Sequence, residues 1–151
     1  RKESIERVVS EMGATAVKPD EIYGVECDIF APCAMGAIIN DFTVEQLKCK
    51  IVAGSANNQL AEDKHGDMLE EKGILYIPDF VINAGGVINV YEELKGYNEA
   101  RAMSRAANIY GSIKRLLAIA KRDNIPTYVA ANRMAEERIA KMAKVGTVYL
   151  G

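Results

Sequence analysis

The sequence predicts an α/β fold, namely the latter part of a doubly wound parallel sheet followed by carboxyl-terminal helices. Short apolar runs at Val25–Phe30, Lys50–Ala53 and Gly73–Ile77 have the length of strands, and segments with helical spacing separate them. Each run ends in a loop rich in glycine, alanine or asparagine. Because ligands of parallel sheets bind beside the carboxyl ends of the strands, these three loops are where we expect a ligand.

The chain begins with a predicted helix, Arg1–Met12, in which apolar residues recur at i, i+3, i+4 and i+7 from Ile5. Gly13 is expected to end this helix, and Ala14–Val17 is a candidate short strand. No initiator methionine precedes the helix, so we expect a chain that starts inside a domain.

Two short helices are predicted between the strands. Thr43 is expected to cap one that runs to Cys49, and Asp67–Lys72 forms the other. The only histidine, His65, is interpreted as a surface or capping residue. No cysteine, serine or second histidine lies near it in the sequence to complete a metal site or a nucleophile pair.

Polar residues follow the second and third predicted strands. Gly54–Gln59 carries four polar side chains and favours a ligand-binding loop, although a solvated polar turn would have the same composition. In Pro78–Gly96, an Ala-Gly-Gly turn feeds a helix, and Gly85-Gly86 is predicted to let the backbone approach a ligand closely. Asn83 beside this turn suits a small polar ligand, and an ordinary glycine turn with an asparagine cap is an equal alternative.

Two long helices are predicted after Gly96, and they divide the chain into residues 1–97 and 98–151. Asn98 is expected to cap the first helix, which lasts to about Arg122, and Asn132 to cap the second. The first helix has one predicted apolar face, made of Met103, Ala107, Tyr110, Ile113 and Leu117. The second has a solvated charged face, made of Glu136, Glu137, Arg138, Lys141 and Lys144. We interpret both as packing or linking elements without chemistry.

The composition excludes several classes of protein. The net charge of −2 and pI near 5.5 leave no basic stripe for a phosphate backbone, so we expect no nucleic-acid partner. No apolar run approaches the roughly 20 residues that span a membrane, and we expect a cytoplasmic protein without a membrane partner. The three cysteines, Cys27, Cys33 and Cys49, lack CxxC spacing and are interpreted as small buried thiols, so no metal site is predicted.

A complete dinucleotide-binding fold carries GxGxxG and, about 20 residues later, an acidic residue for the ribose. Neither occurs in this sequence, and no lysine, serine or carboxylate pair is placed as an obvious acid, base or nucleophile. The residues alone therefore predict only the latter half of an α/β domain that binds a small polar ligand or a nucleotide.

A family resemblance adds to this prediction. The chain resembles the carboxyl-terminal part of the glutamate/leucine/phenylalanine/valine dehydrogenase family over nearly its whole length, and its similarity to the family pattern decreases after about Lys141. The segments that carry the resemblance are CDIFAPCAMGAIIND, KIVAGSANNQL, HGDMLEEKGILYIPDFVINAGGVINV, GYNEARAM and IAKRDNIPTYVAANRMAEERI. It implies a Rossmann-like NAD-binding domain whose glycine fingerprint, with the catalytic lysine and aspartate, lies upstream of Arg1.

The resemblance also implies an activity and site residues. The family deaminates an L-amino acid oxidatively to the 2-oxo acid and ammonia, and NAD accepts the hydride. Cys33 and Ala34 are expected against the adenosine side of NAD, Asn57 and Asn58 near the nicotinamide and its ribose, and Asn83 in contact with the cofactor. Val87 and Val90 are expected to wall the substrate side chain; without the resemblance, plain core packing is the preferred interpretation of these valines.

An apolar wall argues against a glutamate substrate, because it would leave a buried carboxylate unpaired. The resemblance implies L-leucine or another branched-chain amino acid as the substrate, with the phenylalanine and valine enzymes of the family as alternatives. The family implies a homo-oligomer for the intact protein, although the divergent tail, Val145–Gly151, puts oligomer contacts there in doubt. We expect this chain alone to be inactive. A stand-alone, non-catalytic module for nucleotide binding or assembly is the alternative from another class.

Overall fold

The computed structural model describes residues 1–148, and the side chains of residues 1–144. Residues 149–151, which end the predicted helical region and the divergent tail, lie outside the described residues. Within residues 1–148, no helix combines the length and the apolar character needed to cross a membrane.

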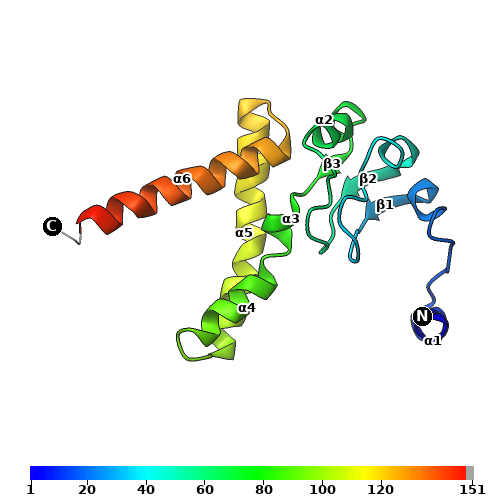
Figure 1. Ribbon diagram of the computed structural model, residues 1–151, viewed down its shortest axis with the longest axis horizontal. Helices are drawn as coiled ribbons and strands as arrows, with labels where there is room; N and C mark the ends of the chain where they lie inside the picture. Colours follow the sequence, from blue (N-terminus) through cyan, green and yellow to red (C-terminus); the bar gives the residue numbers. More distant parts are fainter. Residues whose placement is uncertain (149–151) are drawn as a thin grey trace.

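Three parallel strands form one sheet in the order β1-β2-β3, which confirms the predicted α/β class (Figure 1). Their bounds are β1 Glu26–Phe30, β2 Lys48–Val52 and β3 Leu75–Tyr76. β1 pairs with β2 and β2 pairs with β3, so the carboxyl ends of all three strands point the same way. The prediction that the first strand is buried was wrong, because Ile29 is 56% exposed and only one neighbouring strand, β2, pairs with β1 in the described chain.

The main core lies between the sheet and the helices that connect its strands. The connecting elements are the 3₁₀ turn η2 (Val44–Gln46) and the helix α2 (Lys64–Glu71), and the 3₁₀ turn η1 (Ile22–Gly24) precedes β1. The buried side chains of this core are Ile39, Val44, Leu47, Cys49, Val52, Leu69, Ile74 and Tyr76. The predicted helix from Thr43 to Cys49 was too long, since Leu47 already has an extended backbone and Cys49 pairs with Cys27 in the sheet. Thr43 Oγ1 accepts a hydrogen bond from the Asn40 backbone N–H instead of capping this turn.

The amino-terminal helix α1 (Lys2–Met12) forms where predicted and ends at Gly13 with φ +66°. None of its residues is buried, and Figure 1 places it away from the sheet, beside the amino terminus. The strand predicted at Ala14–Val17 does not form, because this segment is exposed and pairs with no other strand among the described residues.

Two helices follow β3, the short α3 (Asp79–Ile82) and α4 (Gly85–Glu93). The glycine turn predicted at Gly85-Gly86 was wrong, because both glycines belong to the first turn of α4 and neither has positive φ. A Cβ at either position would meet no heavy atom within 4 Å, so the start of α4 faces open space.

The two long helices are α5 (Glu99–Asp123) and α6 (Thr127–Val148), and Figure 1 shows that they cross one another. Asn98 caps α5 as predicted, its Oδ1 accepting from the Arg101 N–H at 2.9 Å. The predicted apolar face of α5 was displaced by about one residue, since Met103 and Tyr110 are 66% and 71% exposed whereas Ala102 and Leu116 are buried. α6 begins directly after Pro126, so Asn132 lies inside it and does not cap it.

The five charged residues predicted for the second long helix are exposed on α6, as expected. α5 and α6 share a second core with α3, formed by Val81, Leu116, Ala120, Ala130 and Ala131. The first turn of α6 is also tied to the sheet, because Thr127 Oγ1 donates to the Tyr76 carbonyl. The division into residues 1–97 and 98–151 remains a prediction.

A buried ion-pair group joins α4 to α5. Glu92 of α4 is fully buried, and its carboxylate pairs with the guanidinium groups of Arg101 and Arg105 on α5. The Arg105 guanidinium also lies 5.3 Å from the centre of the Tyr91 ring. These contacts fix the position of α4 relative to α5, and therefore the position of the side chains that α4 presents on its other face.

Candidate ligand-binding site at the carboxyl edge of the sheet

The loops after β1, β2 and β3 meet at the carboxyl edge of the sheet, as the strand pattern predicted. The first two loops pack in backbone contact, with the Ala56 N–H donating to the Pro32 carbonyl at 2.9 Å. At Gly54 an added Cβ would lie 2.0 Å from the Pro32 oxygen, so only glycine allows this approach. The edge is thus a single connected surface made from three segments that are distant in sequence.

Asn83 and Asn57 join the loops after β3 and β2. Asn83 Nδ2 donates to Asn57 Oδ1 at 2.6 Å and to the Ser55 carbonyl at 3.4 Å. A carbonyl oxygen can only accept, so Ser55 requires the Asn83 NH₂ group to face it. Asn83 Oδ1 then remains as an acceptor and Asn57 Nδ2 as a donor. The two amides therefore offer a donor and an acceptor from adjacent loops.

Asn58 connects all three loops through its backbone. Its N–H donates to Asp79 Oδ2 at 2.7 Å, and its carbonyl accepts from the Ala37 N–H at 2.6 Å. Both Asn58 and Ala37 have positive φ, 51° and 55°. Such a backbone is unfavourable for residues other than glycine and is tolerated by asparagine better than by most, so these hydrogen bonds hold a strained conformation.

A depression of about 440 Å³ opens beside these amides. Its lining is Asn57, Asn58, Asp79, Phe80, Asn83, Ala84 and Val87. Val87 and Val90 are 76% and 60% exposed, so the core-packing interpretation of these valines was wrong. Val87 lines the depression directly, whereas Val90 lies one turn further along α4 and does not.

Cys33 and Ala34 lie on the exposed loop after β1. Hydrogen bonds from the side chain and the backbone of Ser55 lower the pKa of the Cys33 thiol below its ordinary value. Ser55 also accepts from Asn83, so Cys33 adjoins the paired amides without lining the depression. The expectation of buried thiols was therefore wrong for Cys33, whereas Cys49 is buried and Cys27 partly so.

Sequence reasoning missed Asp79 and misplaced Gln59, and both residues shape this edge. Asp79 accepts the Asn58 N–H, and a second hydrogen bond reaches its Oδ1 from the Tyr76 hydroxyl at 3.3 Å. Gln59, expected among the ligand-facing polar residues, is fully buried, and its Nε2 donates to the Gly54 and Ala56 carbonyls at 2.7 and 2.9 Å. An acidic residue directly after a strand was the available signal for Asp79; nothing in the sequence separates Gln59 from its exposed neighbours.

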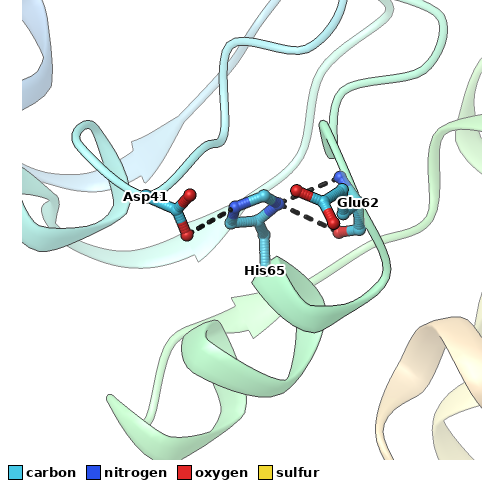
Figure 2. Close-up of side chains that lie close together, drawn as sticks. All are labelled: Asp41, Glu62 and His65. Atoms are coloured by element: carbon cyan, nitrogen blue, oxygen red, sulfur yellow. Dashed lines mark hydrogen bonds and ion pairs between the residues drawn. The ribbon is translucent and has the colours of Figure 1, made fainter.

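His65 is 1% exposed and lies inside α2 without capping it, so the expectation of a surface or capping residue was wrong. Its Nδ1 accepts a hydrogen bond at 3.0 Å from the backbone N–H of Glu62, which precedes α2. The other ring nitrogen, Nε2, then donates to Asp41 Oδ1 at 3.2 Å (Figure 2). Figure 2 shows Asp41 and Glu62 on opposite sides of the ring.

The same three side chains have ligand atoms within 4.8 Å of one another, a spacing that could suit a metal ion. The Lys64 ammonium, however, lies 3.0 Å from Asp41 Oδ1 and 3.2 Å from Glu62 Oε1, and it lowers the pKa of Asp41. With both ring nitrogens bonded and both carboxylates paired, this cluster serves to attach the loop at Asp41 to α2, and we assign it no metal.

Comparison with known proteins agrees with this fold. A sequence model of the glutamate/leucine/phenylalanine/valine dehydrogenase family matches residues 1–146. The chain is 65% identical over 149 residues to a leucine dehydrogenase of Thermoactinomyces intermedius, a match that covers 99% of this chain and 41% of that protein. It is 50% identical over 147 residues to a phenylalanine dehydrogenase of Bacillus thermotolerans, covering 97% of this chain and 38% of that protein.

Among solved structures, an L-tryptophan dehydrogenase from Nostoc punctiforme matches with a TM-score of 0.88 at 50% identity, covering 92% of this chain and 43% of that chain. The chain thus spans less than half the length of the relatives that it matches. A family match over nearly all residues, together with this structural likeness, leads to one conclusion. The chain belongs to the glutamate/leucine/phenylalanine/valine dehydrogenase family.

Proposed function

We propose that the intact protein containing this chain is an NAD-dependent leucine dehydrogenase. It would convert L-leucine, and other branched-chain L-amino acids, with NAD⁺ and water to the 2-oxo acid, ammonium, NADH and a proton. The observation that carries this proposal is the 65% identity to a leucine dehydrogenase over 149 residues. Aromatic amino acids are the alternative substrates, favoured by 50% identity to a phenylalanine dehydrogenase, and a valine dehydrogenase of the same family remains a further alternative.

The carboxyl edge of the sheet has groups that fit the nicotinamide end of NAD. A primary carboxamide accepts through its oxygen and donates through its NH₂ group. Asn57 Nδ2 and Asn83 Oδ1 supply the matching donor and acceptor, and they do so from a hydrogen-bonded pair whose orientation Ser55 fixes. We therefore assign these two amides to the nicotinamide side, Asn58 to the neighbouring ribose, and Cys33 and Ala34 to the adenosine side.

When bound, NAD would supply the acceptor for the hydride that leaves the α-carbon of the amino acid. The residues of this chain would orient and enclose the reactants. Val87, with Val90 one turn beyond it, would give the apolar surface against which a branched side chain packs. Asp79 is the one carboxylate in the depression, and both of its oxygens already accept hydrogen bonds, so we assign it no proton transfer.

The intact protein is expected to form a homo-oligomer, on the ground of the family membership. We place it in the cytoplasm, where the three free cysteines of the described chain would stay reduced. Light scattering on the purified intact protein measures its mass; a monomer at micromolar concentration would contradict the oligomer proposal but not the activity.

The activity is tested by following NADH absorbance with the intact protein and a panel of L-amino acids. We expect kcat/KM to be highest for leucine, with isoleucine and valine used less efficiently. Valine lacks one methylene, a mismatch that costs about 1–3 kcal/mol, and isoleucine branches at a different carbon. A preference for phenylalanine or tryptophan would support the aromatic alternative, and the absence of NADH formation with any amino acid would contradict the proposal.

A further inference from the structure

We propose that Asp79 is a positioning residue for cofactor binding, which rests on the function proposed above. Asp79 begins α3, and the residue that caps the other end of α3 is Asn83. Both residues reach to the loop after β2: Asp79 Oδ2 accepts from the Asn58 N–H at 2.7 Å, and Asn83 Nδ2 donates to Asn57 at 2.6 Å. One turn of helix therefore holds two consecutive residues of the facing loop.

The hydrogen bond to Asp79 fixes a loop conformation that would otherwise be unfavourable. Asn58 has φ +51°, and its carbonyl continues the contact to Ala37, which also has positive φ. A carboxylate that accepts a backbone N–H forms a charge-assisted hydrogen bond, which is stronger than a neutral one. Asp79 thus stabilises the backbone that sets the direction of the Asn57 side chain.

Asp79 is itself held in place from the opposite side. The Tyr76 hydroxyl donates to Asp79 Oδ1 at 3.3 Å, and Tyr76 is only 4% exposed. Burial, more than the nearby Asp79 charge, raises the pKa of Tyr76 well above its usual range, so the hydroxyl remains a donor at all working pH values. The Tyr76 carbonyl in turn accepts from Thr127 on α6. This series of contacts leaves the Asp79 side chain little freedom to leave Asn58.

The consequence for binding is specific. Without the Asp79 carboxylate, the loop would no longer be held at Asn58, and Asn57 and Asn83 would present their donor and acceptor to a carboxamide less often. The cost should fall on NAD, which these amides are proposed to contact, and much less on the amino acid, which packs on α4.

The test uses the intact protein with Asp79→Ala and Asp79→Asn, and with Asp20→Asn as the matched control. Asp20 is an exposed carboxylate in the turn before η1 and β1, outside the three loops. We expect the KM for NAD to rise about tenfold in Asp79→Ala, because a hydrogen bond to a charged acceptor is lost. It should rise about threefold in Asp79→Asn, which keeps a neutral acceptor, and the KM for leucine should change less than twofold in both.

A purely structural role predicts a different result. A loss of stability would lower the melting temperature and, by reducing the folded fraction, the apparent kcat. The KM for NAD would stay at the wild-type value. A KM for NAD unchanged in Asp79→Ala would overturn the inference; if that variant does not fold, an unchanged value in Asp79→Asn does so. Inactivity of the wild-type protein with all amino acids would instead mean that the proposed function is wrong.

Discussion

Asn83 Nδ2 lies 2.6 Å from Asn57 Oδ1, so the loops after β3 and β2 are joined by a hydrogen bond between two amide side chains. The pair fixes which atoms of each amide remain available, because Ser55 O also accepts from Asn83 Nδ2. Two asparagines that lie 26 positions apart in the sequence thereby form one hydrogen-bonded pair, and we propose that Asn83 Oδ1 and Asn57 Nδ2 are its acceptor and donor for a ligand.

The first prediction concerns this pair. Asn83→Ala in the intact protein should lower kcat/KM for NAD by about tenfold or more, since one amide contact and the orientation of the other are lost together. The matched control is Asn89→Ala, which removes an exposed asparagine from α4 in the same helical turn as Val90. Equal effects of the two substitutions on NAD kinetics would argue against a role for the pair.

A second prediction concerns the substrate side chain. Val90→Ser should lower kcat/KM for leucine while leaving the KM for NAD nearly unchanged, because a hydroxyl replaces apolar surface on the proposed wall. Val90 is 60% exposed, so the melting temperature should hardly change. If Val90→Ser leaves the ranking of leucine, valine and phenylalanine as in the wild type, the wall lies elsewhere.

The third prediction uses the lowered pKa of Cys33. A thiol with a depressed pKa becomes a thiolate at lower pH. The rate at which iodoacetamide modifies Cys33 should therefore rise with a pH midpoint below 9.0, the ordinary pKa of a cysteine thiol. Ser55→Ala removes the side-chain hydrogen bond that contributes most to this shift and should move the midpoint upward. Mass spectrometry of the modified peptides separates Cys33 from Cys49, whose pKa is raised by burial and which should react slowly.

Protection in the same experiment reports on cofactor placement. Saturating NAD should slow the modification of Cys33 in the intact protein if this loop contacts the adenosine side. An unchanged rate, with NAD bound, would place the cofactor away from Cys33.

The fourth prediction concerns stability. Glu92→Gln should destabilise the chain by about 2 kcal/mol, because it leaves Arg101 and Arg105 without their buried partner. Both arginines are partly exposed, at 41% and 42%, so water offsets some of the loss. Glu93→Gln changes an exposed neighbour and serves as the control; denaturant unfolding that gives the two variants equal stability would contradict the assigned role of Glu92.

Several elements were predictable because their signal is local. Gly13 and Asn98 mark helix ends through backbone and capping chemistry that needs no tertiary contact, and both act as predicted. The strands were found from their apolar runs, and their parallel pairing followed from the intervening helices. The convergence of Asn57, Asn58 and Asn83 then followed from topology alone.

The errors share a different cause. Asn132 has the same capping chemistry as Asn98, but α6 already begins at Thr127, directly after Pro126. His65 was expected at the surface, and the burial of Glu92 was not predicted. Contacts with Asp41 in the first case, and with Arg101 and Arg105 in the second, make burial favourable. Such contacts depend on the relative placement of whole elements, which the spacing of residues along one element does not contain.

The most direct test of the account compares two polypeptides in one assay, the intact protein and this chain of 151 residues, each supplied with L-leucine and NAD. The intact protein should form NADH, with leucine preferred over phenylalanine and glutamate. The chain alone should show no NADH formation that rises with its concentration. The lining of the described depression consists of amides, apolar side chains and one carboxylate, Asp79, whose two oxygens both accept hydrogen bonds, and it includes no lysine. Leucine-dependent NADH formation by the 151-residue chain, or none by the intact protein, would contradict the account.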